Sequence, residues 1–241
     1  MKWTPQPVGF YVQNGKLGLM FVVSSTESDF RNQVNFISLQ GMADRMDEIQ
    51  EMVGADHKAF SGILPNVMKR SGIKTNVTPE ATVMAVTEAT INLMNMESIP
   101  DSTAVYILGG HGYIGKRVIR ELSDRGIIVL SVNTSSGNDG LTTLPDSLPK
   151  SKHLVVNIAS PNALKGSIRH LQEGTIVLNE AYPEPDAETI ASLKEVGCHL
   201  YHVVGVKAKA CPQFPYAYRG GIPCCAAWPS PDAKVNVMRL A

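Results

Sequence analysis

The sequence predicts an α/β protein with a parallel sheet that is covered by helices on both faces, preceded by a smaller α/β domain. Apolar runs alternate with amphipathic stretches through the second half of the chain, a pattern typical of parallel strands joined by crossover helices. A glycine-rich turn follows the first of these runs and leads into a helix. We place the smaller domain at residues 1–100 and the larger one at residues 101–241.

The smaller domain is expected to begin with a hairpin. The tight-turn pair Asn14-Gly15 separates two apolar strands, and this dipeptide favours a two-residue hairpin loop. Farther on, apolar residues recur at spacings of three and four, which indicates a helix. Thr78 and Pro79 suit the cap and the first position of a second helix. The expected elements are strands at 8–12 and 17–23 and helices at 39–53 and 79–96.

The larger domain shows a regular alternation of strand and helix patterns. The strand runs are short, apolar and bounded by polar or glycine-containing segments, as expected for strands buried on both faces. We expect strands at 103–108, 127–132, 154–158, 175–178 and 200–204, and helices at 116–125, 163–172 and 186–196.

Composition excludes several classes of protein. The chain has 22 Lys+Arg against 22 Asp+Glu, so it lacks the basic excess of most nucleic-acid binders. A hydrophobic content of 44% argues against disorder, and no apolar run is long enough to span a membrane. Four Cys, without a paired C-x-x-C, favour neither a disulfide framework nor a metal site. We therefore expect a cytoplasmic protein without nucleic-acid or membrane partners.

The most informative segment is the glycine turn. Gly110, Gly112 and Gly115 match G-x-G-x-x-G between a strand and a helix, the setting of a dinucleotide-binding turn in a Rossmann-like domain. Gly112 would let a pyrophosphate approach the backbone, and the helix N-terminus would face the anion. The alternative is a tight turn without a ligand. The expected cofactor-binding residues are Gly110, His111, Gly112, Tyr113, Ile114, Gly115, Asn133, Thr134, Ser135, Ala159, Ser160, Pro161 and Gly221.

The cofactor itself stays open between NADP and NAD. The stretch after the second strand contains no acid before Asp139 to bind a ribose diol, which favours NADP. The same stretch has no Arg for a 2′-phosphate, which weakens that preference. Because the ribose acid is missing, S-adenosylmethionine is an alternative ligand for the same turn.

Four segments resemble dehydrogenases that carry a small N-terminal α/β domain before a Rossmann domain, such as methylenetetrahydrofolate dehydrogenase and shikimate dehydrogenase. The segments are 76–79, 109–115, the two stretches 155–161 and 174–183 taken together, and the turn at 220–223. In the folate enzymes that last turn precedes a C-terminal helix. The strand that ends in Ala181-Tyr182-Pro183, together with the cysteines late in the chain, has a weaker likeness to fatty acyl carrier protein reductases. The Tyr-x-x-x-Lys pattern of the folate enzymes is absent, and the catalytic Lys position of the shikimate enzymes holds no Lys, so neither substrate is carried over.

Side chains at the carboxyl ends of the strands are candidates for catalysis. Glu180 and Tyr182 could carry a proton, as could Lys74, and Cys224 could be a nucleophile at a helix N-terminus. Each has an alternative interpretation: Glu180 could be a charge in solvent, Tyr182 could serve packing, and Cys224 could be a small buried thiol. His199 and His202 could line a polar substrate site or mark a solvated strand end.

The sequence therefore predicts an NAD(P)-dependent oxidoreductase that acts on a small-molecule metabolite in a cleft between the two domains. Two alternatives stay open: a methyltransferase that uses S-adenosylmethionine, and a nucleotide-binding protein without catalysis. By analogy with this architecture we expect a homodimer.

Overall fold

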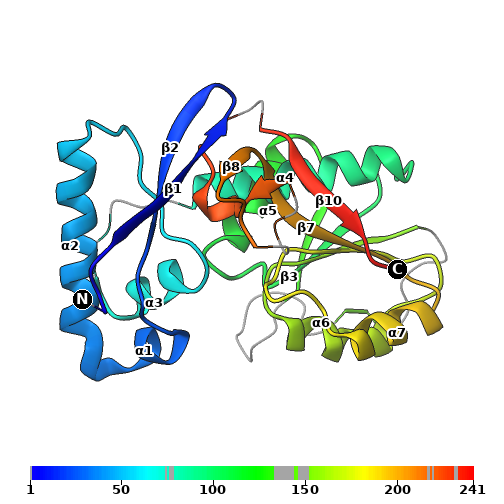
Figure 1. Cartoon of the computed structure of the whole chain (residues 1–241). Coiled ribbons are helices and arrows are strands. Elements are labelled where there is room, and N and C mark those ends of the chain that lie inside the picture. Colours follow the sequence, from blue (N-terminus) through cyan, green and yellow to red (C-terminus); the bar gives the residue numbers. More distant parts are fainter. Residues whose placement is uncertain are drawn as a thin grey trace. The chain divides into compact units, whose positions relative to one another are not determined.

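The computed structural model divides into two compact units (Figure 1). Unit 1 comprises Met1–Ala81 and Val206–Ala233, and unit 2 comprises Thr82–Gly205 and Lys234–Ala241. The structure describes residues 2–73, 75, 79–132, 144–145, 152–215, 218, 220–230 and 233–241.

Unit 1 contains the expected hairpin. Strands β1 (Gln6–Gln13) and β2 (Lys16–Val22) pair antiparallel across Asn14 and Gly15, whose φ angles are 50° and 77°. Positive φ at both turn residues matches the twist of the flanking strands. Strand β8 (Lys209–Cys211) pairs with the other side of β1, so the sheet order is β2-β1-β8 and β2 is an edge strand.

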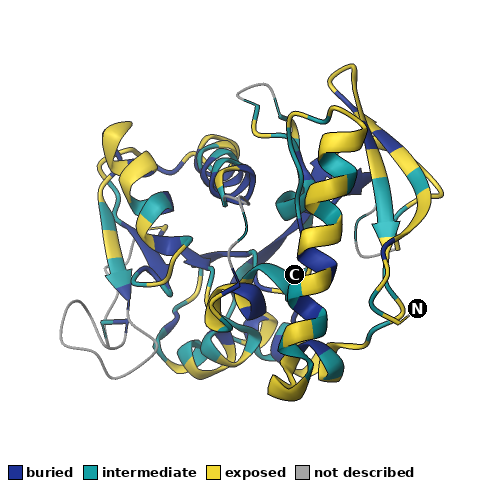
Figure 2. Cartoon of the chain, turned by 90° about the vertical axis from the view of Figure 1, so that its left-hand side faces the viewer, coloured by how far each residue is buried: buried dark blue, intermediate teal, exposed yellow. Residues whose placement is uncertain are grey.

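The helices of unit 1 build their own apolar core. They are α1 (Glu27–Arg31), η1 (Gln33–Asn35), α2 (Phe36–Met52) and α3 (Leu64–Arg70). Leu39 and Met42 on one face of α2 are buried, whereas other faces of this helix are exposed (Figure 2). They pack with Phe60 and Met68 in one cluster. The helix predicted at 39–53 is therefore confirmed.

Unit 2 is built on a mostly parallel sheet. Its strands are β3 (Val105–Leu108), β4 (Val129–Val132), β5 (Leu154–Asn157), β6 (Ile176–Asn179), β7 (His199–Lys207) and β10 (Val235–Arg239). The order is β10-β7-β6-β5-β3-β4, and all pairs from β4 to β7 are parallel. The end of β10 lies beside the start of β7, because the N–H of Leu240 donates to the carbonyl of Leu200. The α/β class with a parallel sheet is confirmed.

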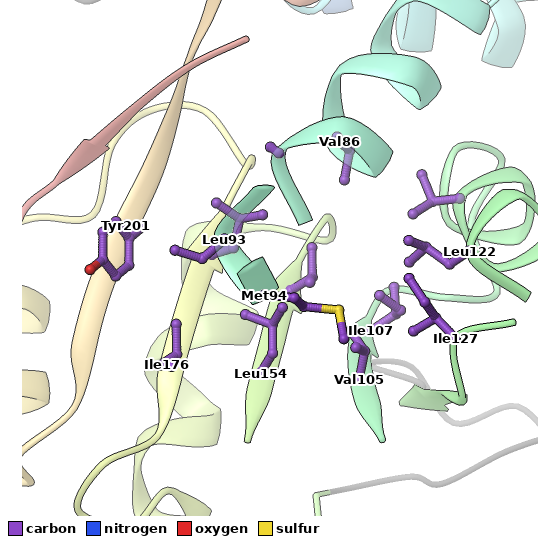
Figure 3. Close-up of a cluster of buried hydrophobic side chains, with 14 of the residues drawn as sticks. Val86, Leu93, Met94, Val105, Ile107, Leu122, Ile127, Leu154, Ile176 and Tyr201 are labelled. Atoms are coloured by element: carbon purple, nitrogen blue, oxygen red, sulfur yellow. The ribbon is translucent and has the colours of Figure 1, made fainter. Parts of the chain in front are cut away.

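Helices cover both faces of this sheet (Figure 1). Helices α4 (Glu80–Met96) and α5 (Gly115–Asp124) share one apolar cluster with the strands. Figure 3 shows Leu93 and Met94 of α4, Ile107 of β3 and Leu122 of α5 in this cluster. Helix α6 (Pro161–Ser167), the 3-10 turn η2 (Ile168–His170) and helix α7 (Ala187–Glu195) lie over the second cluster. No helix in the described part of the chain is both long and apolar enough to cross a membrane.

The two strands that follow β3 in the chain, β4 and β5, lie on opposite sides of it in the sheet. The chain moves from β3 outward to β4 and next adds β5 on the opposite side, so β3 is the reversal point of the sheet. Loops that leave β3 and β5 therefore diverge at the carboxyl edge between these two strands. In open α/β sheets this point is where a crevice for ligands forms.

Two expectations differ from the structure. The division does not fall at residue 100, because α4 packs into the core of unit 2 and the segment 206–233 pairs with the hairpin of unit 1. The helix expected after Pro223 is wrong. Strand β9 (Gly221–Ile222) is followed by a three-residue 3-10 turn, η4 (Cys224–Ala226), and then by β10. Pro229 and Pro231 in the intervening sequence disfavour a helix.

Candidate functional site

The glycine turn connects β3 to α5 at the reversal point of the sheet. Gly109 has φ of 85°, and its N–H donates to the carbonyl of Val132 at the end of β4 (3.0 Å). The N–H of Gly112 donates to the carbonyl of Gly109 (2.9 Å), and that of Lys116 donates to the carbonyl of Gly112 (3.1 Å). The turn is therefore tied to the end of β4 and leads directly into the first turn of α5.

The three glycines of the motif have different surroundings. A Cβ on Gly110 would lie 2.3 Å from the Ser131 hydroxyl, and one on Gly115 would lie 2.3 Å from the Gly109 carbonyl oxygen. Packing within the protein therefore requires glycine at both positions. A Cβ on Gly112 would meet only the Gly109 carbonyl oxygen, at 3.1 Å. This is a single close contact, so internal packing demands glycine less strongly at Gly112 than at Gly110 and Gly115.

Polar groups at this turn lack partners in the described residues. No acceptor there receives the N–H of Ile114 or Gly115 at the start of α5. These N–H groups carry the positive end of the helix dipole. The Ser131 hydroxyl and the Nε2 atom of His111 are buried and without a hydrogen-bond partner among the same residues. A ligand with several acceptor oxygens would match this set of donors.

Arg117 is a residue that the sequence reasoning did not single out. Its guanidinium lies 4.0 Å from the centre of the Tyr113 ring and donates to the Tyr113 carbonyl (3.0 Å). One turn of helix separates the two residues, so this cation is held beside the glycine turn. The signal in the sequence is an Arg four positions after the second variable residue of the motif, which places it on the same helix face.

Of the residues expected from the loop after β5, Ala159 contacts the glycine turn. A Cβ on Gly109 would lie 2.9 Å from that of Ala159. Ser160 caps α6, because its hydroxyl accepts from the N–H of Ala163 (3.1 Å), and Pro161 occupies the first turn of that helix. The structure therefore brings Ala159 to the turn and gives Ser160 and Pro161 a local role in starting α6.

A buried polar ladder crosses three strands at the carboxyl edge. Asn157, Asn179 and His202 are register partners on β5, β6 and β7, and each is at most 3% exposed. The Nδ2 of Asn157 donates to Oδ1 of Asn179 (2.7 Å), and Nδ2 of Asn179 contacts Nδ1 of His202 (2.9 Å). Asn157 also accepts from the N–H of Ala159 (3.2 Å). The ladder therefore connects the sheet to the loop that contacts the glycine turn.

The ladder fixes the state of His202. Since the Asn179 amide nitrogen can only donate, Nδ1 of His202 accepts and the proton lies on Nε2. Burial lowers the pKa of His202, while the charge of Glu184 opposes this shift. A neutral imidazole with a defined tautomer is therefore held at the carboxyl edge. The sequence reasoning considered His202 but not the two asparagines, which lie 45 and 23 residues earlier in the chain.

Glu180 and Tyr182 follow β6 directly at the same edge. The N–H of Glu180 donates to the carbonyl of Asn157 (2.9 Å), and the side chain of Tyr182 is 61% exposed. Both residues therefore lie on the loop above the polar ladder, and their role as proton carriers stays a prediction.

Gly221 and Cys224 belong to unit 1, in β9 and η4. Cys224 is not at the N-terminus of an α-helix as expected, because η4 has only three residues. The hydrogen bond from Cys224 instead lowers the pKa of its neighbour Cys225, and burial opposes this shift. Lys74, Asn133, Thr134 and Ser135 lie outside the described residues.

Comparisons with known protein families and with curated proteins find no match. Within the described residues, no group of three or more His, Cys, Asp or Glu side chains could hold a metal ion.

Proposed function

We propose that unit 2 binds NADP or NAD and that the protein is an oxidoreductase acting on a small-molecule metabolite. The observation that carries this proposal is the sparse packing at Gly112, where an added Cβ would meet one protein atom within 4 Å, the Gly109 carbonyl oxygen. Of the three motif glycines, Gly112 is the one that internal packing requires least, and it lies where a pyrophosphate would approach the backbone. A turn that served only to connect strand and helix would need glycine less at this position than at Gly110 and Gly115.

Three further features support a dinucleotide. The turn lies at the reversal point of a parallel sheet. The N–H groups of Ile114 and Gly115 have no acceptor in the described part of the chain, and Arg117 adds a cation beside the turn. Together they could offset the charge of a diphosphate. When bound, a nicotinamide cofactor would supply the hydride chemistry. The protein would orient the reactants, with Glu180 or Tyr182 as proton carrier.

Nucleotide binding is tested by calorimetric titration with NADP, NAD and S-adenosylmethionine in parallel. Gly112→Val should abolish binding of the preferred nucleotide, because its side chain would occupy the position proposed for the pyrophosphate, and it should leave the fold intact, because an added Cβ meets one protein atom there. Gly166→Val is the control for a glycine-to-valine change away from the turn: Gly166 lies in α6, and a Cβ there would meet nothing within 4 Å. This control should bind as the wild type does.

The outcomes separate the functions. Binding of S-adenosylmethionine alone would replace the oxidoreductase by a methyltransferase, and binding of no nucleotide would contradict the proposal. Nucleotide affinity that is unchanged in Gly112→Val would show that the turn is not the site. If a nicotinamide nucleotide binds, turnover of its reduced form with panels of carbonyl metabolites distinguishes an enzyme from a binding protein.

A further inference from the structure

A large cavity lies wholly within unit 1. Its volume is about 880 Å³, and all its lining residues belong to the two segments that make up this unit. Every residue of β2 lines it. The opposite wall comes from the C-terminal half of α2 and the loop at 53–62, and Trp228 and Phe214 complete it. The cavity is therefore a groove that follows one strand along its whole length.

The strand along this groove has a free edge. Strand β2 pairs with β1 alone among the described strands. The hairpin closes on the pair Gln13 and Lys16, so hydrogen-bonded and non-hydrogen-bonded pairs alternate from there. Leu17 and Leu19 consequently direct their N–H and C=O groups away from β1. Such unpaired groups form a template on which another extended chain can pair.

The facing helix offers an apolar stripe. Met46, Ile49, Gln50 and Val53 line the groove at the spacing of one helix face. On the strand side, Leu17 and Leu19 are 62% and 51% exposed. An extended chain that entered the groove could cover these apolar side chains while it paired with the backbone of β2.

The groove is about one strand wide. Seven residues of β2 extend over roughly 24 Å, which spreads the 880 Å³ over a cross-section of roughly 37 Å². Strands in packed sheets lie ~4.8 Å apart, with sheets ~10 Å apart, so one strand occupies roughly 48 Å². The cross-section of the groove is therefore of the same order as that of a single extended segment and far below that of the three-stranded sheet of a second copy.

Charge at one end of the groove defines the partner further. The ammonium of Lys16 lies 5.3 Å from the centre of the Trp228 ring and has no ion-pair partner among the described residues. His57 packs on the same ring, and burial lowers its pKa. Lys58 is paired with Asp47, which leaves Asp56 as the other unpaired charge of the lining, on the exposed loop. Lys16 therefore complements a carboxylate.

We propose that the free edge of β2 binds an extended apolar peptide as an additional strand, with an acidic side chain or terminal carboxylate against Lys16. Backbone pairing would supply affinity, and alternate side chains would contact Leu17 and Leu19 or the α2 stripe. This interaction is separate from nucleotide binding in unit 2, so either proposal can fail without the other.

The test uses a phage-displayed library of random heptapeptides, selected against the full-length protein. Wild type should enrich peptides with alternating apolar residues and an acidic residue at one end. Leu19→Pro removes an N–H that points away from β1, at an edge position that tolerates proline, and should weaken binding of the selected peptide at least tenfold. Leu19→Thr loses the same apolar side chain but keeps the N–H, so it should bind the peptide more tightly than Leu19→Pro does. Lys16→Gln should cost about threefold and remove the preference for the acid.

A second measurement leaves the protein unchanged. The selected peptide is synthesised with N-methyl groups on alternate residues, in two versions that differ in phase. One version should lose binding, because its methyl groups replace the N–H groups that face β2, and the other should keep it. Equal binding of both versions, enrichment of the same peptides by Leu19→Pro, or no enriched peptide at all would overturn the proposal. Self-association that Leu19→Pro abolishes would assign the edge to a second copy instead.

Discussion

The four thiols of the chain differ in the environment that controls their reactivity. Cys198 is buried against the carbonyl of Gln172 (3.6 Å), and burial raises the pKa of its thiol to about 11. Cys211 is exposed on β8. Since the thiolate is the species that reacts, burial should protect Cys198 twice, by limiting access and by keeping the thiol protonated.

We therefore predict that iodoacetamide at pH 8 alkylates Cys211 and leaves Cys198 unmodified until the protein is unfolded. Mass spectrometry of proteolytic peptides after timed quenching measures both rates, and the reaction in denaturant is the control. Equal rates at Cys198 and Cys211 in the native protein would contradict the burial of Cys198.

Asn179 is the central residue of the polar ladder, because it bonds to both Asn157 and His202. Asn179→Leu would leave a donor on Asn157 and an acceptor on His202 buried without partners. Each such group costs about 1–3 kcal/mol, so we predict a loss of about 3 kcal/mol in the free energy of unfolding. Urea denaturation measures it, with Asn92→Leu on the exposed side of α4 as control. A loss equal to that of the control would show that the ladder contributes no stability.

At the scale of elements, a structural feature could be predicted from the sequence when the residues that determine it are close together in the chain. The hairpin and the glycine turn follow from residues that are adjacent in sequence, such as Asn14-Gly15 and the Gly110 motif, and the structure contains both. The polar ladder depends on which strands become neighbours and in which register, and this is decided by tertiary packing. A polar residue at the end of two apolar strand runs, Asn157 and Asn179, and one inside a third, His202, was its visible signal. Strands of two or three residues, such as β8 and β9, carry no periodic pattern.

The amino end of the sheet is closed by a charged contact between α4 and β7. The hydroxyl of Tyr201 donates to the carboxylate of Glu97, Lys152 lies 3.7 Å from it, and Nδ1 of His199 lies 3.9 Å from it. The Tyr201 hydrogen bond and these neighbouring charges lower the pKa of Glu97. The carboxylate is therefore favoured in the folded state relative to the unfolded chain, in which a Glu titrates at about 4.3.

From this shift we predict an acid-dependent loss of stability. A lowered folded-state pKa contributes stability that is fully present above the unfolded value and is lost as the pH falls through the folded value. The free energy of unfolding should therefore decline below about pH 5, and Glu97→Gln should make that decline shallower. Urea titrations from pH 3 to 7 measure the slope, with the exposed Glu121→Gln as control. An unchanged slope in Glu97→Gln would assign the acid sensitivity to other carboxylates.

At the scale of the whole molecule, zero net charge is compatible with anion binding. The 22 basic and 22 acidic residues cancel over the chain, but the field at the glycine turn comes from backbone N–H groups and from Arg117. A positive potential confined to one turn attracts a compact anion such as a diphosphate, but it attracts a long polyanion only weakly. The balance of charges and the proposed dinucleotide site are therefore consistent, and the chemistry of each unit is set by its own residues.

Hydrogen exchange over the whole chain tests where the nucleotide acts. At 100 times its Kd a ligand stabilises the folded state by ~2.7 kcal/mol. Amides that exchange only when the binding site unfolds should then exchange about 100-fold more slowly. We predict that NADP or NAD slows exchange at 109–119 and 129–132, because these amides form the turn and the adjoining strand. The hairpin at 6–22 in unit 1 serves as the internal reference, and Gly112→Val is the variant in which the protection should disappear. Protection that is confined to the hairpin, or that persists in Gly112→Val, would place the nucleotide elsewhere than at the end of β3.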